Sequence, residues 1–125
     1  YLGLDMSIQI ILGYLFAPVA WLMGIPWGEA VVAGELLGLK TTLNEFVAYP
    51  ALASLEPGIL SDKSKLITFY ALCGFANFSS VGILVSGLGA MAPERKEDLI
   101  EVSFQALVGA TLASCMTGLI VGCLI

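Results

Sequence analysis

Residues 66–92 form a continuous stretch of the sequence that contains no charged side chain. A helix needs about 20 predominantly apolar residues to cross the hydrocarbon core of a bilayer, so this stretch is long enough to span one. Two further apolar blocks, 6–28 and 99–125, lie on either side of it. Charged residues make up 12% of the chain, whereas about 25% is usual in soluble domains. The sequence therefore predicts an all-α membrane protein, because it holds too few charges to surround a soluble core.

Composition also excludes several classes of function. The chain carries 10 acidic and 5 basic residues, a net charge of −5, which argues against nucleic-acid binding. It contains no histidine, so histidine-based zinc sites and Ser-His-Asp triads are excluded. Cys73, Cys115 and Cys123 lie in apolar runs, and their spacing indicates small core residues rather than disulfides or metal ligands. We expect no cofactor and no metal site in this chain.

The apolar blocks and the breaks between them divide the chain into four predicted segments. Their lengths, interruptions and flanking charges predict the following order along the sequence. We expect an interfacial or tilted helix over 1–25, a re-entrant helical hairpin over 26–55, a broken transmembrane helix over 64–92 and a transmembrane helix over 98–125.

The hairpin is predicted from two helices that are each too short to span. Pro26 can begin a helix over 27–37, Gly38 is expected to end it, and 44–55 can form a second helix. Short helices joined at a break inside an apolar region are typical of re-entrant hairpins.

The expected broken helix follows a turn-forming linker, with Ser61 or Asp62 as its N-cap. A polar patch over 74–82, bounded by Gly74 and Gly82, interrupts its apolar sequence. Helices that break at mid-membrane depth are where secondary transporters bind substrates and ions.

Glu45 is the most informative single residue. It lies within the apolar hairpin, and a carboxylate in the hydrocarbon region costs roughly 3 kcal/mol on insertion scales. One interpretation is a substrate hydrogen-bond acceptor or proton carrier. The alternative is a structural ion pair with Lys40, although five residues of separation do not align two side chains on one helix face.

Asn77, Ser79 and Ser80 form the polar part of the expected helix break. Such side chains often do no more than join membrane helices by hydrogen bonds. Beside Phe75 and Phe78 they also suit a small ligand that carries a ring and several hydroxyl groups.

Four other residues of the first half have less specific interpretations. Glu29 and Glu35 lie near the predicted mouth of the hairpin, and we favour a solvated position for Glu29. Trp21 and Trp27 are interpreted as anchors at the membrane interface rather than as a ligand cage.

Residues 38–49 read G-L-K-T-T-L-N-E-F-V-A-Y and match the G-x-K-x-x-x-N-E-F-V-A signature of concentrative nucleoside transporters. Residues 71–80 are similar to a second characteristic stretch of that family, and 88–93 to a third. The chain resembles the C-terminal portion of this family over nearly its whole length.

The resemblance implies a fold and a function. The fold is the second half of an inverted-repeat transporter, and the function is cation-coupled symport of nucleosides, driven by sodium or protons. The fragment would supply the ribose-binding side of the site. The implied substrate-binding residues are Glu45, Phe75, Asn77 and Ser80, with Asn44, Lys40 and Ser79 as supporting residues.

In the family, the base-reading hairpin and the sodium ligands lie in the first half. The coupling-ion site, for Na+ or H+, is therefore expected outside this chain, which begins at Tyr1 and is taken as a piece of a longer protein. Implied partners are the nucleoside, the lipid bilayer, the N-terminal half of the same transporter and two further copies in a homotrimer. The implied location is the plasma (inner) membrane, as a multi-pass integral protein.

Two other functional classes fit the sequence less well. A structural module of a membrane complex would bind no ligand, but such a module has no need for a carboxylate at membrane depth. An intramembrane enzyme is disfavoured by the lack of histidine and of closely spaced carboxylates, so we expect no enzyme.

Overall fold

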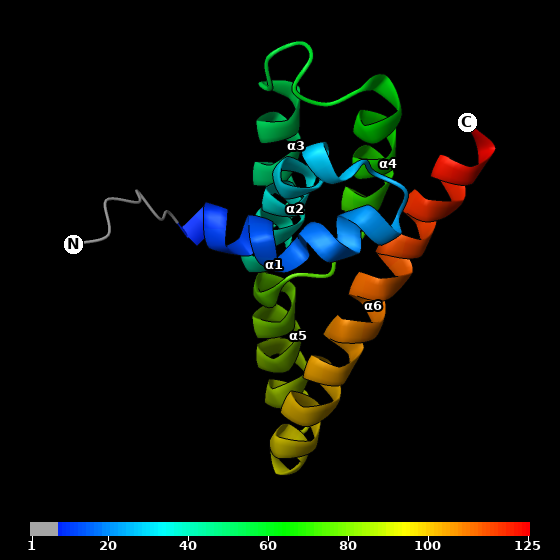
Figure 1. Ribbon diagram of the computed structural model, residues 1–125. Helices are drawn as coiled ribbons and strands as arrows, with labels where there is room; N and C mark the ends of the chain where they lie inside the picture. The colour runs from blue at the N-terminus through cyan, green and yellow to red at the C-terminus, as the bar shows by residue number, and fades with distance from the viewer. Residues whose placement is uncertain (1–7) are drawn as a thin grey trace.

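The computed structural model describes residues 8–125, and helices are the only regular secondary structure within that range. The last helix, α6, is the longest and runs alongside α5 and α4 (Figure 1). The elements are α1 (Ile8–Leu22), α2 (Trp27–Thr42), α3 (Glu45–Ala53), α4 (Asp62–Leu72), α5 (Phe78–Met91), the 3-10 turn η1 (Pro93–Arg95) and α6 (Lys96–Leu124). This architecture confirms the all-α class.

Helices α1 and α2 pack closely and meet at an angle of 118°. The sharp turn between them contains Gly24, whose φ of 97° lies in the left-handed region that favours glycine. Small residues let the two backbones touch, since a Cβ atom on Gly34 would lie 2.8 Å from the backbone nitrogen of Ala17. The bend directs α1 across the other helices instead of along them (Figure 1).

The predicted helix end at Gly38 is wrong. Helix α2 continues through Gly38 to Thr42, and the break falls at Leu43 and Asn44. Gly38 instead serves packing, because a Cβ atom there would lie 2.5 Å from Cβ of Leu12 on α1. The hydroxyl of Thr42 donates a hydrogen bond of 2.8 Å to the Gly38 carbonyl within the last turn of α2.

Side-chain caps begin the next two helices. Asn44 starts α3, where its side-chain oxygen accepts a hydrogen bond of 3.1 Å from the backbone nitrogen of Val47. The linker then turns at Gly58, whose φ is 95°. Of the two caps expected for α4, the structure selects Ser61, which accepts from the backbone nitrogen of Ser64 at 3.3 Å.

A gap at residues 73–77 separates α4 from α5 and overlaps the first part of the predicted polar patch. Gly82 does not bound this break, because it lies within α5. The two helices have 11 and 14 residues. Together they provide roughly 37 Å of helix, enough to cross a bilayer only as a pair.

The final helix starts earlier than expected. It begins at Lys96, so Glu97 and Asp98 occupy its first turn, where acidic side chains interact favourably with the helix dipole. Further along, α6 packs tightly against α4. A Cβ atom on Gly118 would lie 2.8 Å from the carbonyl oxygen of Ile67.

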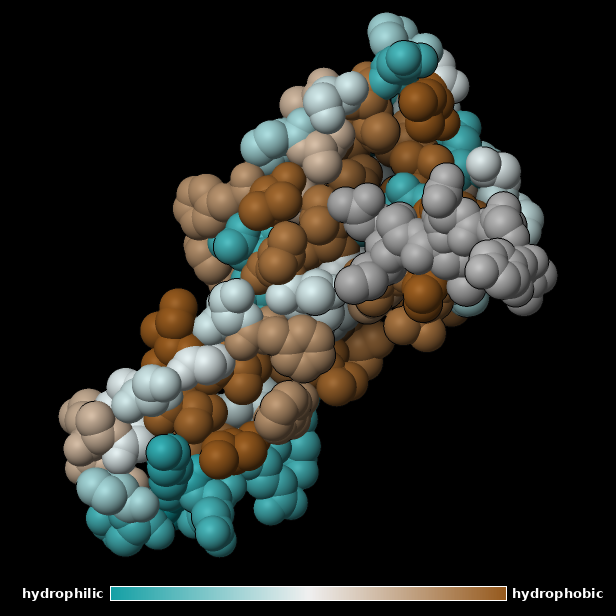
Figure 2. Space-filling model, turned by 90° about the vertical axis from the view of Figure 1, so that its left-hand side faces the viewer, coloured by the Kyte–Doolittle hydropathy of each residue, from teal (hydrophilic) through white to brown (hydrophobic). Residues whose placement is uncertain are grey.

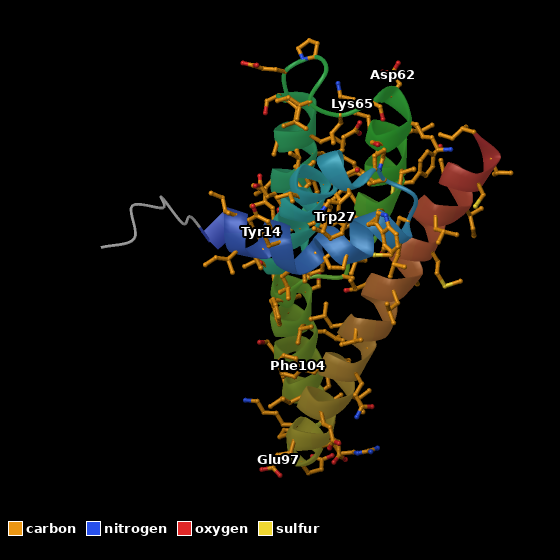
Figure 3. The ribbon with its side chains drawn as sticks, viewed as in Figure 1. Tyr14, Trp27, Asp62, Lys65, Glu97 and Phe104 are labelled. Atoms are coloured by element: carbon orange, nitrogen blue, oxygen red, sulfur yellow. The ribbon has the colours of Figure 1, made fainter. Side chains whose placement is uncertain are left out.

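The distribution of polarity fits a membrane. Within residues 8–125 one continuous helical segment, Pro93–Leu124, is long and apolar enough to span, and an 18-residue stretch of it has a mean hydropathy of 2.0. Helices α1 and α2 pass the same criterion together, despite their bend. Asp62 and Lys65 lie at one end of the molecule and Glu97 at the other (Figure 3). The face shown in Figure 2 is mostly hydrophobic between hydrophilic ends.

Candidate functional site

The two helix breaks lie against each other, so four helix ends meet in one place. The lower end of α3 faces the upper end of α5 in Figure 1. Two hydrogen bonds join the breaks. The hydroxyl of Ser79 donates to the carbonyl of Leu43 at 3.1 Å, and Nδ2 of Asn77 donates to Oε2 of Glu45 at 3.1 Å. Residues 32 positions or more apart in the sequence thereby form one polar junction inside an apolar structure.

Glu45 is the anionic centre of this junction. It is the first residue of α3, and its side chain is 7% exposed. The N-terminal ends of α3 and α5 both point toward it, and helix N-termini stabilise negative charge. Its structural pairing with Lys40 is not found: the single ion pair within residues 8–125 joins Arg95 to Asp98. The partner of Glu45 is therefore Asn77.

Asn77 uses both ends of its amide. While Nδ2 donates to Glu45, Oδ1 accepts from the backbone nitrogen of Ser80 at 2.7 Å and from its hydroxyl at 2.8 Å. The latter bonds cap α5 and hold Ser80 in place. Asn77 is 2% exposed, so these contacts fix its orientation within the described chain itself.

Phe75 lies beside this network but points outward, with 71% of its surface exposed. A cavity of about 210 Å³ is lined by Phe75, Asn77 and Ser80, together with Ser103 of α6. Small-molecule sites usually measure about 300–1,000 Å³, so this cavity can enclose part of a nucleoside-sized ligand. A larger groove of about 660 Å³ between α3 and α4 contains neither Glu45 nor Asn77, and we do not assign it to the site.

The expected supporting residues are all at the junction, but in different roles. Asn44 caps α3, Ser79 bonds to the hairpin, and Lys40 is enclosed with 1% exposure. Within residues 8–125 no group of three or more acidic or cysteine side chains could hold a metal ion.

Sequence reasoning missed Tyr49 and Ser103. The Tyr49 hydroxyl donates to Sγ of Cys73 at 3.0 Å and to the carbonyl of Phe69 at 3.2 Å, which ties α3 to the end of α4. Tyr49 belongs to the signature over 38–49, which could have indicated a role at the site. No local sequence feature distinguishes Ser103 from other serines of the last apolar block. The cysteine prediction holds for Cys115, which is buried, but not for the exposed Cys73 and Cys123; all three are free thiols.

Glu29 is not simply solvated. It accepts hydrogen bonds from the backbone nitrogen and the hydroxyl of Ser61, at 3.0 and 3.1 Å, and so ties the start of α2 to the start of α4. Glu35 is partly buried at the contact with α1. Trp21 and Trp27 stack edge to face at 6.4 Å and stay 53% and 58% exposed, which suits interfacial anchors.

Comparison with known sequences gives consistent matches. Residues 2–122 match the family described as Na+ dependent nucleoside transporter C-terminus. The nucleoside permease NupC of Helicobacter pylori is 45% identical over 121 residues, which cover 94% of this chain and 29% of the permease. Sodium/nucleoside cotransporter 1 of Mus musculus is 39% identical over 133 residues, covering 95% of this chain and 20% of the cotransporter.

Solved structures agree with the sequences. CNTnw in an inward-facing substrate-bound state has a TM-score of 0.85 and 46% identity, covering 94% of this chain and 29% of that chain. A CNTnw variant in an outward-facing state has a TM-score of 0.84 and is 45% identical in sequence to this chain. The chain thus spans less than a third of each of these relatives. The matches cover nearly all of this chain. Members of the nucleoside transporter family are multi-pass membrane proteins and not enzymes. The chain belongs to this family as a C-terminal portion.

Proposed function

We propose that this chain supplies the ribose-binding side of the substrate site in a nucleoside symporter coupled to sodium or protons. The observation that carries the proposal is the hydrogen bond between Asn77 and Glu45, which joins the two helix breaks into one polar site. Charged side chains at membrane depth are costly and usually belong to transport pathways.

The chemistry suits neighbouring hydroxyl groups. One carboxylate oxygen of Glu45, Oε2, accepts from Asn77, while within residues 8–125 no hydrogen bond to Oε1 is present. A ribose hydroxyl can donate to that free oxygen, and the Ser80 hydroxyl, whose hydrogen is donated to Asn77, can accept beside it. The exposed Phe75 ring offers an apolar face for the sugar or base.

The remaining parts of the proposal concern the whole transporter. Helices α2 and α3 would enter and leave the membrane on the same side as a re-entrant hairpin, since they have 16 and 9 residues and neither can span. The base-reading side and the coupling-ion site would come from the N-terminal half. The complete protein would work in the plasma (inner) membrane as a homotrimer.

Uptake of labelled uridine by the full-length protein tests this function. We expect uptake in vesicles to exceed that of empty vesicles and to rise with an inward gradient of sodium or of protons. Measuring both gradients separately identifies the ion. A folded full-length protein that binds no uridine and transports none would instead support the structural-module alternative.

The chain of 125 residues alone is expected not to transport. Its cavity of about 210 Å³ encloses only part of a nucleoside, so the other side of the site is missing. Reconstituted fragment should give the same uridine uptake as empty vesicles, with the full-length protein as the positive control. Concentrative uptake by the fragment would show that the site is complete without the N-terminal half.

A further inference from the structure

Among residues 8–125, Ser103 is the one polar side chain that α6 contributes to the cavity of about 210 Å³. The rest of the wall that α6 forms is apolar and consists of Ala106, Leu107 and Ala110. Across the cavity, the polar residues are Asn77 and Ser80. The proposed ribose contacts do not use Ser103, so its place in this wall calls for a physical explanation.

The Ser103 hydroxyl differs from the other hydroxyl groups of α6 in its hydrogen bonding. Thr111, Ser114 and Thr117 each donate to the carbonyl four residues earlier, at 2.8, 2.9 and 3.1 Å. Within the described range 8–125, the side chain of Ser103 forms neither this bond nor any other. Its hydroxyl therefore stays free to donate and to accept.

This free hydroxyl is not sealed inside the protein. Ser103 is 5% exposed. In the part of the chain that the structure describes, Thr68 Oγ1 is the one fully enclosed side-chain oxygen or nitrogen without a hydrogen-bond partner. Since Oγ of Ser103 also lacks a partner, it is not fully enclosed, and the space beside it is the cavity that Ser103 lines. A ligand group in that cavity would meet an available hydroxyl.

Asn77 connects this cavity to the carboxylate of Glu45. Its Nδ2 donates to Glu45, whereas its Oδ1 accepts from Ser80, which lines the cavity together with Asn77. Glu45 itself does not line the cavity. A ligand seated on Asn77 can therefore place one side at the carboxylate and another side in the cavity.

Ribose carries hydroxyl groups on both of its faces. The neighbouring 2′- and 3′-hydroxyls lie on one face of the ring and suit the free oxygen of Glu45, whereas the 5′-hydroxymethyl group projects from the other face. A hydroxyl that enters a largely apolar cavity loses its hydrogen bonds to water and needs new partners. Ser80 can accept from it, because the Ser80 hydrogen is donated to Asn77, and Ser103 can donate to it.

We propose that the cavity between α5 and α6 binds the 5′-hydroxymethyl group of the nucleoside, and that Ser103 donates a hydrogen bond to its 5′-oxygen. Ser103 is then a substrate-binding residue contributed by the last helix. The inference deepens the proposed function and rests on it, because it assumes that the ring hydroxyls bind at Glu45. Since the remaining α6 residues of the wall are apolar, loss of this hydroxyl leaves no replacement donor on that side.

Binding of uridine and of two deoxy analogues to the full-length protein tests this assignment. Ser103→Ala removes the hydroxyl and should lower the affinity for uridine about fivefold. In wild type, 5′-deoxyuridine and 3′-deoxyuridine should both bind more weakly than uridine. In Ser103→Ala, the preference for uridine over 5′-deoxyuridine should shrink about fivefold, whereas the preference over 3′-deoxyuridine should not change.

Two controls separate binding from structure. Thr117→Val also removes one hydroxyl from α6, but that hydroxyl bonds to Ala113 and Thr117 does not line the cavity, so the three affinities should stay as in wild type. The melting temperature of Ser103→Ala should equal that of wild type. An unchanged preference over 5′-deoxyuridine in Ser103→Ala would overturn the inference, whether or not the melting temperature falls. An equal shrinkage of both preferences would do so too, because Ser103 would then act on the sugar as a whole.

Failure of this inference and failure of the proposed function give different results. If Glu45→Gln binds uridine as tightly as wild type does, the ribose contact at Glu45 is wrong, and the placement of the 5′-hydroxyl falls with it. If Glu45→Gln weakens uridine binding but Ser103→Ala keeps the full preference over 5′-deoxyuridine, only the assignment of Ser103 is lost.

Discussion

Replacing Glu45 with glutamine should lower the affinity of the full-length protein for uridine by at least tenfold. The amide keeps the shape of the carboxylate but removes its charge. Hydrogen bonds to charged groups contribute roughly 1.5–3 kcal/mol each, and 1.4 kcal/mol corresponds to a factor of ten. Equilibrium binding of uridine to purified protein measures the effect directly.

Glu29→Gln is the matched control for this change. Glu29 bonds to Ser61 near the polar end of α2, away from the junction, so its replacement should affect affinity much less. A second variant combines Lys40→Met with Glu45→Gln. Since these two residues form no ion pair, removing both charges should not restore binding.

The ligand provides an independent check on Glu45. Nucleosides that lack a ribose hydroxyl should bind more weakly than uridine to wild type, and the difference should shrink in Glu45→Gln. Full rescue by the double change, or equal uridine affinity of Glu45→Gln and wild type, would contradict the ribose role of Glu45.

Asn77→Asp should be more damaging still, with a loss of uridine affinity of at least a hundredfold at neutral pH. The substitution keeps an oxygen that can cap α5, but it replaces the donor to Glu45 with a second carboxylate. In the structure, Nδ2 of Asn77 lies 3.1 Å from Oε2 of Glu45, and a carboxylate oxygen would take the place of that nitrogen. Unit charges about 4 Å apart repel by about 4 kcal/mol at an effective dielectric constant of 20. Glu45 would have to turn away or take up a proton, and either response disrupts the site.

Asn44→Asp makes the same chemical change at the other asparagine cap. Asn44 accepts from Val47 and does not bond to Glu45, so an aspartate there keeps its capping role. We expect the Asn44 variant to bind uridine more tightly than the Asn77 variant by at least tenfold. Equal affinities would mean that the contact between Asn77 and Glu45 contributes nothing specific.

The sequence was sufficient for features that depend on composition and on local chemistry. Charge-free lengths predicted the membrane class, and a short polar residue before an apolar run marked the start of α4. Gly38 shows where local rules fail. Glycine is a weak helix former, but here the gain from close packing against Leu12 outweighs that local preference. Whether Gly38 ends the helix or lies within it depends on its packing against α1, which the local sequence does not contain.

The sequence alone also could not predict which distant segments contact each other. The interpretation of Glu45 left open a pairing with Lys40, which is near in sequence, whereas its partner Asn77 lies 32 residues away. Ser103 reaches the cavity because α6 runs back along α5, a consequence of tertiary packing that no local pattern contains.

The two carboxylates on the hairpin constrain how this part of the protein can move. Glu29 joins the hairpin to the broken helix at one end, through Ser61, and Glu45 joins them at the other, through Asn77. A gate that opened between the hairpin and the broken helix would have to break at least one of these bonds and expose its carboxylate. A displacement that carries both as one rigid block leaves all of them intact. The rigid-block displacement therefore leaves the polar contacts between the hairpin and the broken helix unbroken and both carboxylates paired.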